Sequence, residues 1–171
     1  MSERKFDERK AHYIVATGII VNDGKYLIAK RSEKEKAFPG KWTVPGGKLV
    51  MDDYAVRKAD TSAGQWYNVC EDLVRREVME EVGLRVKELK YVASLVYVRE
   101  DGIPTFVISL FGKYCGGEVV LCKDLTDYRW VDLEEAKGYD LIDGIYDEIE
   151  MVDKHLKGES LREWGREGVG K

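Results

Sequence analysis

The sequence predicts an α/β fold in which a mixed β-sheet is sandwiched between helices. Short runs rich in β-branched residues alternate with polar turns, as strands and their connections do. Two stretches, residues 69–82 and 145–156, place apolar residues three and four positions apart and predict amphipathic helices. Because each helix must bury its apolar side, we expect one on each face of the sheet.

One domain accounts for the chain, since 171 residues with 44% hydrophobic content can bury one sizeable core. A linker rich in Pro or Ser and an internal repeat are both absent from the sequence. We therefore expect a charged N-terminal segment over residues 1–10, a single domain over 11–157 and a mobile C-terminal tail over 158–171.

The strands are expected in chain order, each set off by turn residues. Residues 13–21 and 25–31 flank Asn22-Asp23-Gly24, which predicts a hairpin. A polar loop over 32–40 leads to a short strand at Trp42. Asp101-Gly102 predicts a second hairpin. The remaining expected elements are strands at 91–99, 105–114, 118–121 and 128–131 and a short helix at 133–137.

The helix expected at 69–82 has a clear apolar stripe formed by Val74, Val78 and Val82. Asn68, three residues before Glu71, is the expected N-cap, and Gly83 is the expected left-handed stop.

A second face of the same helix carries three carboxylates. Glu77, Glu80 and Glu81 stand at i, i+3 and i+4, which are neighbouring positions on a helix. Like charges this close destabilise a helix unless a cation lies between them, and Mg²⁺ or Mn²⁺ prefers such oxygen ligands. The alternative is an ordinary solvated face of a Glu-rich helix.

The residues before this helix favour the metal interpretation. A short apolar strand ends in Pro45-Gly46-Gly47, where two glycines let the backbone turn and approach a ligand closely. Residues 76–84 read Arg-Glu-Val-Met-Glu-Glu-Val-Gly-Leu. Together the strand, loop and helix resemble the Nudix box of the Nudix hydrolase superfamily, and residues 76–84 match every fixed position of its second half.

The first half of the box departs from the family pattern. Counting from Gly47, the seventh position is Asp53 where the family has Glu, and residues 54–75 separate it from Arg76 where the family has seven residues. The box loop therefore contains an insertion, which we place at about residues 54–68. The resemblance implies that Asp53 braces the loop by pairing with Arg76.

The resemblance also implies an αβα sandwich and a metal-dependent hydrolase. The reaction would cleave a nucleoside diphosphate linked to another moiety, such as a noncanonical or oxidised nucleoside triphosphate or an ADP-ribose-like sugar nucleotide. Glu80 and Glu81 would be ligands of Mg²⁺, with Mn²⁺ as the alternative. Glu77 would be a ligand or orient water, and the Gly46 carbonyl would complete the shell. Several relatives take a further acidic residue from a later loop, for which Asp124 is the first candidate and Asp127 the second.

The expected substrate contacts have equally good structural explanations. Arg31 ends a strand toward the loop region and is either a phosphate or base contact or a surface charge. The insertion carries Tyr54, Trp66 and Tyr67, whose rings either stack on a nucleobase or pack in a core or dimer interface. We expect the insertion to fold over the cleft, with Trp66 or Tyr67 lining it.

Composition restricts the partners. Lys plus Arg number 28 against 32 Asp plus Glu, a net charge of −4 that gives no general attraction for nucleic acid. Three cysteines without paired spacing fit a reducing cytoplasm, and the sequence contains neither an apolar signal segment nor a membrane span. A small nucleotide is the expected partner, and a homodimer is left open.

Two functional classes stay open. Retention of all three helical carboxylates favours a hydrolase over a Nudix-fold module that binds or senses a nucleotide without cleaving it. Isomerisation of an isoprenoid diphosphate on the same fold is disfavoured, because no recognisable Cys or His motif lies near the expected active strands.

Overall fold

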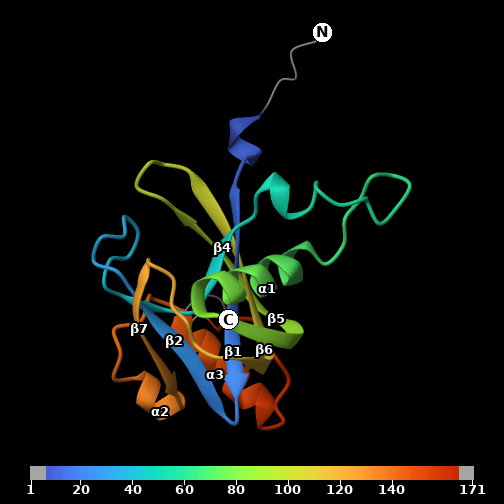
Figure 1. The fold of residues 1–171 in the computed structure, drawn as a ribbon. Helices are drawn as coiled ribbons and strands as arrows, with labels where there is room; N and C mark the ends of the chain where they lie inside the picture. The colour runs from blue at the N-terminus through green and yellow to red at the C-terminus, as the bar shows by residue number, and fades with distance from the viewer. Residues whose placement is uncertain (1–6, 166–171) are drawn as a thin grey trace.

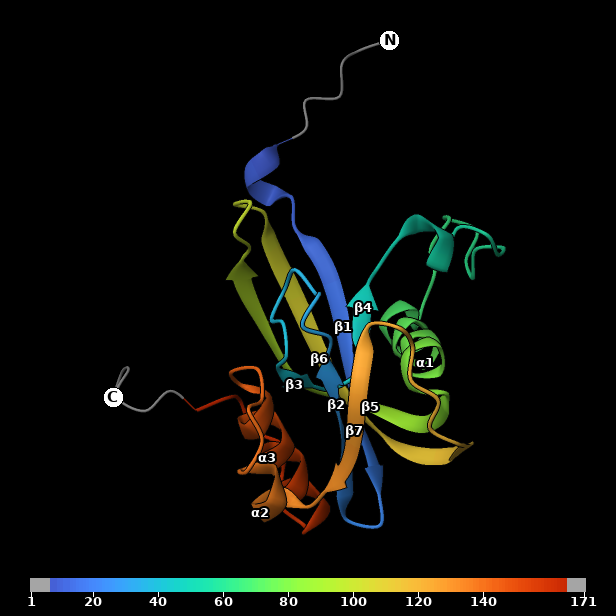
Figure 2. The ribbon, with the colours of Figure 1, turned by 60° about the vertical axis from the view of Figure 1, so that its left-hand side comes forward.

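A computed structural model describes residues 7–165, and it contains a seven-stranded mixed sheet with helices on both faces, as expected (Figure 1). The strand order is β3-β2-β1-β6-β5, with β4 paired to β1 and β7 paired to β2. Helix α1 lies on one side of the sheet, and α2 and α3 lie on the other (Figure 2). The strands are β1 (Tyr13–Asn22), β2 (Lys25–Arg31), β3 (Trp42–Thr43), β4 (Gly46–Lys48), β5 (Leu84–Val98), β6 (Pro104–Gly117) and β7 (Leu125–Val131), and the helices are α1 (Val69–Val82), α2 (Leu133–Ala136) and α3 (Ile145–Leu156), with single 3₁₀ turns η1 (Glu8–Lys10) and η2 (Met51–Asp53).

Strand β1 changes partners halfway along its length, and this change positions the glycine turn. Its last residues pair with β2, at Val21–Tyr26 and Asn22–Lys25. Its first half pairs instead with β4, where Thr17 faces Gly46. Along its other edge β1 runs parallel to β6. The expected turn at Gly46-Gly47 is wrong, because both glycines lie in strand β4 and neither has a left-handed φ. We keep the name glycine turn for Pro45-Gly46-Gly47, the segment that leads into β4.

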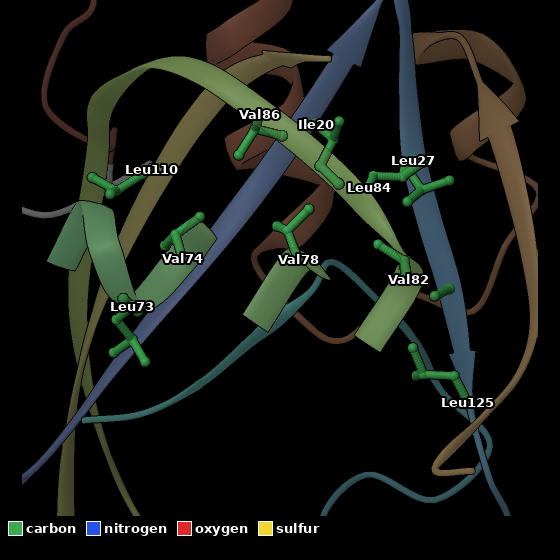
Figure 3. Close-up of a cluster of buried hydrophobic side chains, with 12 residues drawn as sticks. Ile20, Leu27, Leu73, Val74, Val78, Val82, Leu84, Val86, Leu110 and Leu125 are labelled. Atoms are coloured by element: carbon green, nitrogen blue, oxygen red, sulfur yellow. The ribbon is translucent and has the colours of Figure 1, made fainter. Parts of the chain in front are cut away.

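Two apolar cores lie on opposite faces of the sheet. Beneath α1, Val74, Val78 and Val82 are fully buried, as expected from their stripe (Figure 3). Gly18 of β1 lets the helix approach, since a Cβ built there would lie 2.6 Å from Val74 Cγ1. Beneath α3, Ile149 packs in the second core.

Three local expectations were wrong. Asn68 does not cap α1 with its side chain, because it has a left-handed φ of 56° that turns the chain into the helix. No strand forms at 118–121, since β6 continues to Gly117. Strand β5 begins at Leu84, directly after α1, where Leu84 pairs with Gly117. The left-handed Gly83 that ends α1 was expected and is present, with a φ of 73°.

The insertion forms its own small structure beside the N-terminal end of α1. In Figures 1 and 2 it extends away from the sheet. The ring centroids of Tyr54 and Trp66 are 5.3 Å apart, and the Trp66 indole N–H donates to the Arg57 carbonyl. The Tyr67 side chain is exposed, and its backbone N–H donates to Asp60. The insertion is thus held mainly by contacts within itself.

The ends of the described chain have little regular structure. Residues 8–10 form η1, and residues 159–165 form no helix or strand. The rest of the expected N-terminal segment and C-terminal tail, residues 1–6 and 166–171, lies outside the described residues. Within residues 7–165 no helix is long and apolar enough to cross a membrane.

Candidate active site

The glycine turn holds Glu81 directly. The Gly46 N–H donates to Glu81 Oε2 at 3.0 Å. The turn itself is fixed to β1, because the Gly18 N–H donates to the Pro45 carbonyl at 2.8 Å. Glu81 is therefore bound by the amide of Gly46, whereas the carbonyl of Gly46 as a metal ligand stays a prediction.

Gly47 makes room for Glu77. A Cβ built at Gly47 would overlap the Glu77 carboxylate, so any side chain there would displace it. The Glu77 side chain is only 13% exposed. The consecutive glycines thus have separate roles, one as a donor to Glu81 and one as a space for Glu77. The sequence showed the pair of glycines but not this division.

Arg76 is shared among three carboxylates. Its Nε lies 2.8 Å from Asp53 Oδ1, its Nη2 lies 2.8 Å from Glu77 Oε1, and its Nη1 lies 2.8 Å from Glu80 Oε2. The expected contact between Asp53 and Arg76 is present, and Asp53 is 8% exposed. It is an ion pair without good hydrogen-bond geometry, because the Arg76 Nε–H has no acceptor in line within residues 7–165.

The three carboxylates do not converge as expected. Glu80 points outward to Arg76, with 58% of its side chain exposed, while Glu77 and Glu81 face the glycine turn. Within residues 7–165 no three Asp, Glu, His or Cys side chains are grouped closely enough to hold a metal ion. The physical reason is the guanidinium, which neutralises Glu77 and Glu80 from one side.

Burial shifts the pKa values of the two carboxylates beside the glycines. Burial raises the pKa of the Glu81 carboxyl to about 7; the Gly46 N–H lowers it in part, and the negative charges of Glu77 and Asp124 raise it further. Burial also raises the pKa of Glu77, against the lowering effect of Arg76. Two desolvated carboxylates beside a turn without side chains form an oxygen donor set that suits Mg²⁺ or Mn²⁺.

Asp124 and Arg31 lie in neighbouring segments, because Arg31 at the end of β2 pairs with Leu125 of β7. The Ser32 N–H donates to the Asp124 carbonyl at 2.9 Å, which ties the later loop to the end of β2. The charges of both Asp124 and Arg31 act on Glu81. Arg31 also donates to Glu35 and to the Ala37 carbonyl, so it orders the loop after β2.

The other sequence candidates lie elsewhere. Asp127 pairs with Arg129 and accepts from the Tyr128 N–H, so its carboxylate is bound by neighbouring residues of β7. Trp66 packs on Tyr54, and Tyr67 is 59% exposed in the insertion. The charges of Asp124 and Arg31 thus act on Glu81, whereas the contacts of Trp66 and Tyr67 lie within the insertion.

Comparisons with known proteins agree with this geometry. Residues 69–151 match the NUDIX domain family. The chain is 25% identical over 141 residues to the nucleoside triphosphatase NudI of Klebsiella pneumoniae, covering 76% of this chain and 89% of the relative. The match to the family begins at α1, directly after the insertion that interrupts the box.

Solved structures show the same architecture. The MutT protein from Methanosarcina mazei superposes with a TM-score of 0.64 at 27% identity, covering 87% of this chain and 98% of that one. The NUDIX domain of Shewanella oneidensis NrtR, solved with ADP ribose, superposes with a TM-score of 0.65 at 17% identity, covering 89% and 94%. The second likeness concerns the fold alone.

A mixed sheet between helices, with a glycine turn set against a carboxylate-bearing helix, defines a Nudix-type pyrophosphohydrolase. The chain belongs to the Nudix hydrolase superfamily.

Proposed function

We propose that this enzyme uses a divalent metal to cleave the diphosphate linkage of a nucleoside diphosphate derivative. A noncanonical or oxidised nucleoside triphosphate is the first candidate substrate, and an ADP-ribose-like sugar nucleotide is the second. The observation that carries the proposal is the pair of desolvated carboxylates, Glu77 and Glu81, held against the glycine turn. The name of the Klebsiella relative, a nucleoside triphosphatase, favours the triphosphate.

Different residues of the chain would bind the metal, bind the phosphate oxygens and accept a proton. Glu77 and Glu81 would hold Mg²⁺ or Mn²⁺, with Glu80 as a further ligand after release from Arg76. When bound, the metal would neutralise diphosphate charge and make water more acidic. Arg31, whose charge acts on Glu81, would bind phosphate oxygens. Asp124 is the candidate base that accepts a proton from the attacking water.

A panel of nucleotides tests this proposal. We would incubate the protein with nucleoside triphosphates, ADP-ribose, NADH and dinucleoside polyphosphates, each with Mg²⁺, with Mn²⁺ or with EDTA, and measure phosphate and pyrophosphate release. Hydrolysis that requires the metal and is lost in Glu81→Gln is the expected result. Tight nucleotide binding without product would instead identify a non-catalytic binding module.

A further inference from the structure

A second buried carboxylate, Glu148, lies on the opposite face of the sheet from α1. Glu148 belongs to the first turn of α3 and is 5% exposed. Ser109 of β6 lies close enough to this carboxylate to lower its pKa, and Ser109 accepts from the Thr17 hydroxyl at 3.1 Å. Burial raises the pKa of the Glu148 carboxyl, and the neighbouring negative charge of Asp147 raises it as well.

Another acidic residue of the same helix shows how this protein satisfies a carboxylate that serves structure. Asp153 is 9% exposed, accepts from the buried Tyr26 hydroxyl at 3.0 Å and pairs with Lys157 at 2.6 Å. Glu148 has a hydroxyl partner and a like-charged neighbour among the described residues. Since a buried carboxylate is costly without N–H donors or a cation, Glu148 retains acceptor capacity for a ligand.

Glu148 is connected to the glycine turn by one row across the sheet. Gly46 of β4 faces Thr17 of β1, which faces Ser109 of β6. Neighbouring strands lie about 4.8 Å apart, so Ser109 is about 10 Å from the glycine turn. A nucleoside whose diphosphate lies at the turn can place its base over this row.

The sheet face next to this row is mainly apolar, and it is exposed at its edge on β5. Val15, Val107 and Leu95 form the adjacent row, and Leu95 is 39% exposed. Beyond it the loop after β2 crosses to β5, where the ring centroids of Phe38 and Tyr97 are 6.2 Å apart. In Figure 2 this loop lies above α3. An apolar floor between an aromatic pair and a carboxylate suits a flat heterocycle with polar edges.

A further buried polar group lies on this face. Thr105 is fully buried, and its hydroxyl has no hydrogen-bond partner within residues 7–165. It shares a face of β6 with Ser109, because side chains two and four positions apart on a strand point the same way. Thr105 pairs across the sheet with Tyr97, so it marks the far end of this apolar strip.

We propose that Glu148 is a specificity-determining residue that binds the nucleobase and favours a guanine-type edge. An ionised carboxylate only accepts hydrogen bonds, and it can accept from both oxygens. Guanine presents a ring N–H beside an exocyclic amino group, so one carboxylate can bind both donors. Adenine and cytosine each place an acceptor beside their amino group and match this carboxylate less well. The inference rests on the proposed function, because it takes the diphosphate to lie at the glycine turn.

The test compares GTP, ITP and ATP as substrates of the wild type and of Glu148→Gln, with kcat/KM as the readout. ITP lacks the exocyclic amino group, so the wild type should prefer GTP over ITP by roughly tenfold. In Glu148→Gln this preference should fall to about twofold. The kcat/KM for ATP should also rise relative to that for GTP, because an amide offers one donor and one acceptor. Thermal melting of the variant should be unchanged or higher, since a buried charge is removed.

Asp147→Asn is the matched control, because it removes the same charge from the exposed neighbouring position. Asp147→Asn should keep the wild-type ratios of kcat/KM among GTP, ITP and ATP. The inference is overturned if the wild type treats GTP and ITP alike, or if Glu148→Gln lowers kcat/KM equally for all three nucleotides. If no nucleotide is hydrolysed, the proposed function fails. Calorimetric binding of GMP and IMP then tests the inference. The wild type should bind GMP more tightly than IMP by the same ratio, and Glu148→Gln should lose this preference to the same extent.

Discussion

Helices α1 and α3 lie on opposite faces of one sheet, and each turns carboxylates toward it, yet the two faces neutralise them differently. On α1, Glu77 meets the Arg76 guanidinium and Glu81 meets the Gly46 N–H. On α3, Glu148 meets the hydroxyl of Ser109. The first arrangement concentrates more negative charge than its protein partners neutralise, which suits a cation. The second offers acceptors to neutral donors, which suits a heterocycle. A substrate with both a diphosphate and a base would use both faces.

The largest expected effect comes from removing charge at the glycine turn. Glu81→Gln should reduce turnover by about 10²- to 10⁴-fold, as loss of a group acting on the reacting centre does. Its melting temperature at pH 8 should be unchanged or higher, because the pKa of Glu81 is raised to about 7 and its charge is unfavourable above that pH. Added Mg²⁺ should stabilise the wild type more than the variant.

Glu71→Gln, on the same helix but outside the site, is the matched control for Glu81→Gln and should keep wild-type turnover. If Glu81→Gln loses folding and activity in parallel, Glu81 has a structural role. The α1 face would then no longer differ from the α3 face as a site for a cation.

Gly47→Ala should give the next largest effect. Its Cβ would overlap the Glu77 carboxylate and push it from the turn. We expect apparent Mg²⁺ affinity to weaken by about 10- to 100-fold, as when the support of a metal ligand is lost. Gly138→Ala is the control, because a Cβ there would lie 3.4 Å from the Glu135 carbonyl oxygen. Unchanged Mg²⁺ titration in Gly47→Ala would show that Glu77 does not hold the metal.

Arg76→Gln tests whether the guanidinium balances the α1 face. Asp53, Glu77 and Glu80 would lose their shared cation, so the variant should be destabilised by about 1 kcal/mol, a modest value because Arg76 is 35% exposed. Urea unfolding measures this change. Asp53→Asn should cost less, since Arg76 keeps Glu77 and Glu80. Equal losses in the two variants would show that bracing by Asp53 is the whole role of Arg76.

The α3 face should respond to pH through Glu148. Because the pKa of Glu148 is raised in the folded protein, its stabilising contribution is fully present below the unfolded pKa and is lost as pH rises through the folded pKa. Glu148→Gln should therefore melt at a higher temperature than the wild type at pH 8, and the difference should shrink toward pH 4.5. A constant difference across this range, measured by calorimetry, would show that Glu148 does not titrate in this way.

Deleting residues 55–64 should have the smallest effect on the site. The contact between Tyr54 and Trp66 brings the ends of the deletion together, and the hydrogen bonds of the insertion lie mainly within it. We expect the metal requirement to persist and melting to change little. Broader substrate choice or a higher KM would restore the expectation that the insertion lines the cleft. A change from dimer to monomer would identify it as an oligomerisation element.

Local patterns predicted the helices well. The stripe of Val74, Val78 and Val82 predicted α1, Gly83 predicted where it ends, and the apolar period at 145–156 predicted α3. Both signals depend on residues within two turns of one another, so they can be read without knowing the fold. The Asn68 side chain does not cap α1, because the backbone of Asn68 is left-handed where the chain leaves the insertion and enters the helix.

Distant pairing decided what the sequence left open. Strand β4 exists because β1 changes partners, and the early start of β5 follows from its pairing with the end of β6. The separation of Glu80 from Glu77 and Glu81 depends on where Arg76 and Asp53 meet, across the insertion. Glu148 reads in the sequence as one of many charges on an amphipathic helix, and only its contact with Ser109 reveals it as buried.

The sequence by itself determined the box helix, its carboxylates and the glycines before it, because their spacing along one chain segment fixes their placement on one helix face and one turn. Tertiary structure alone decided which carboxylates face the turn, which one Arg76 holds outward, and that another lies buried on the opposite face. The physical reason is that burial and neutralisation depend on partners brought together by the sheet from distant parts of the chain, and side-chain spacing carries no information about them.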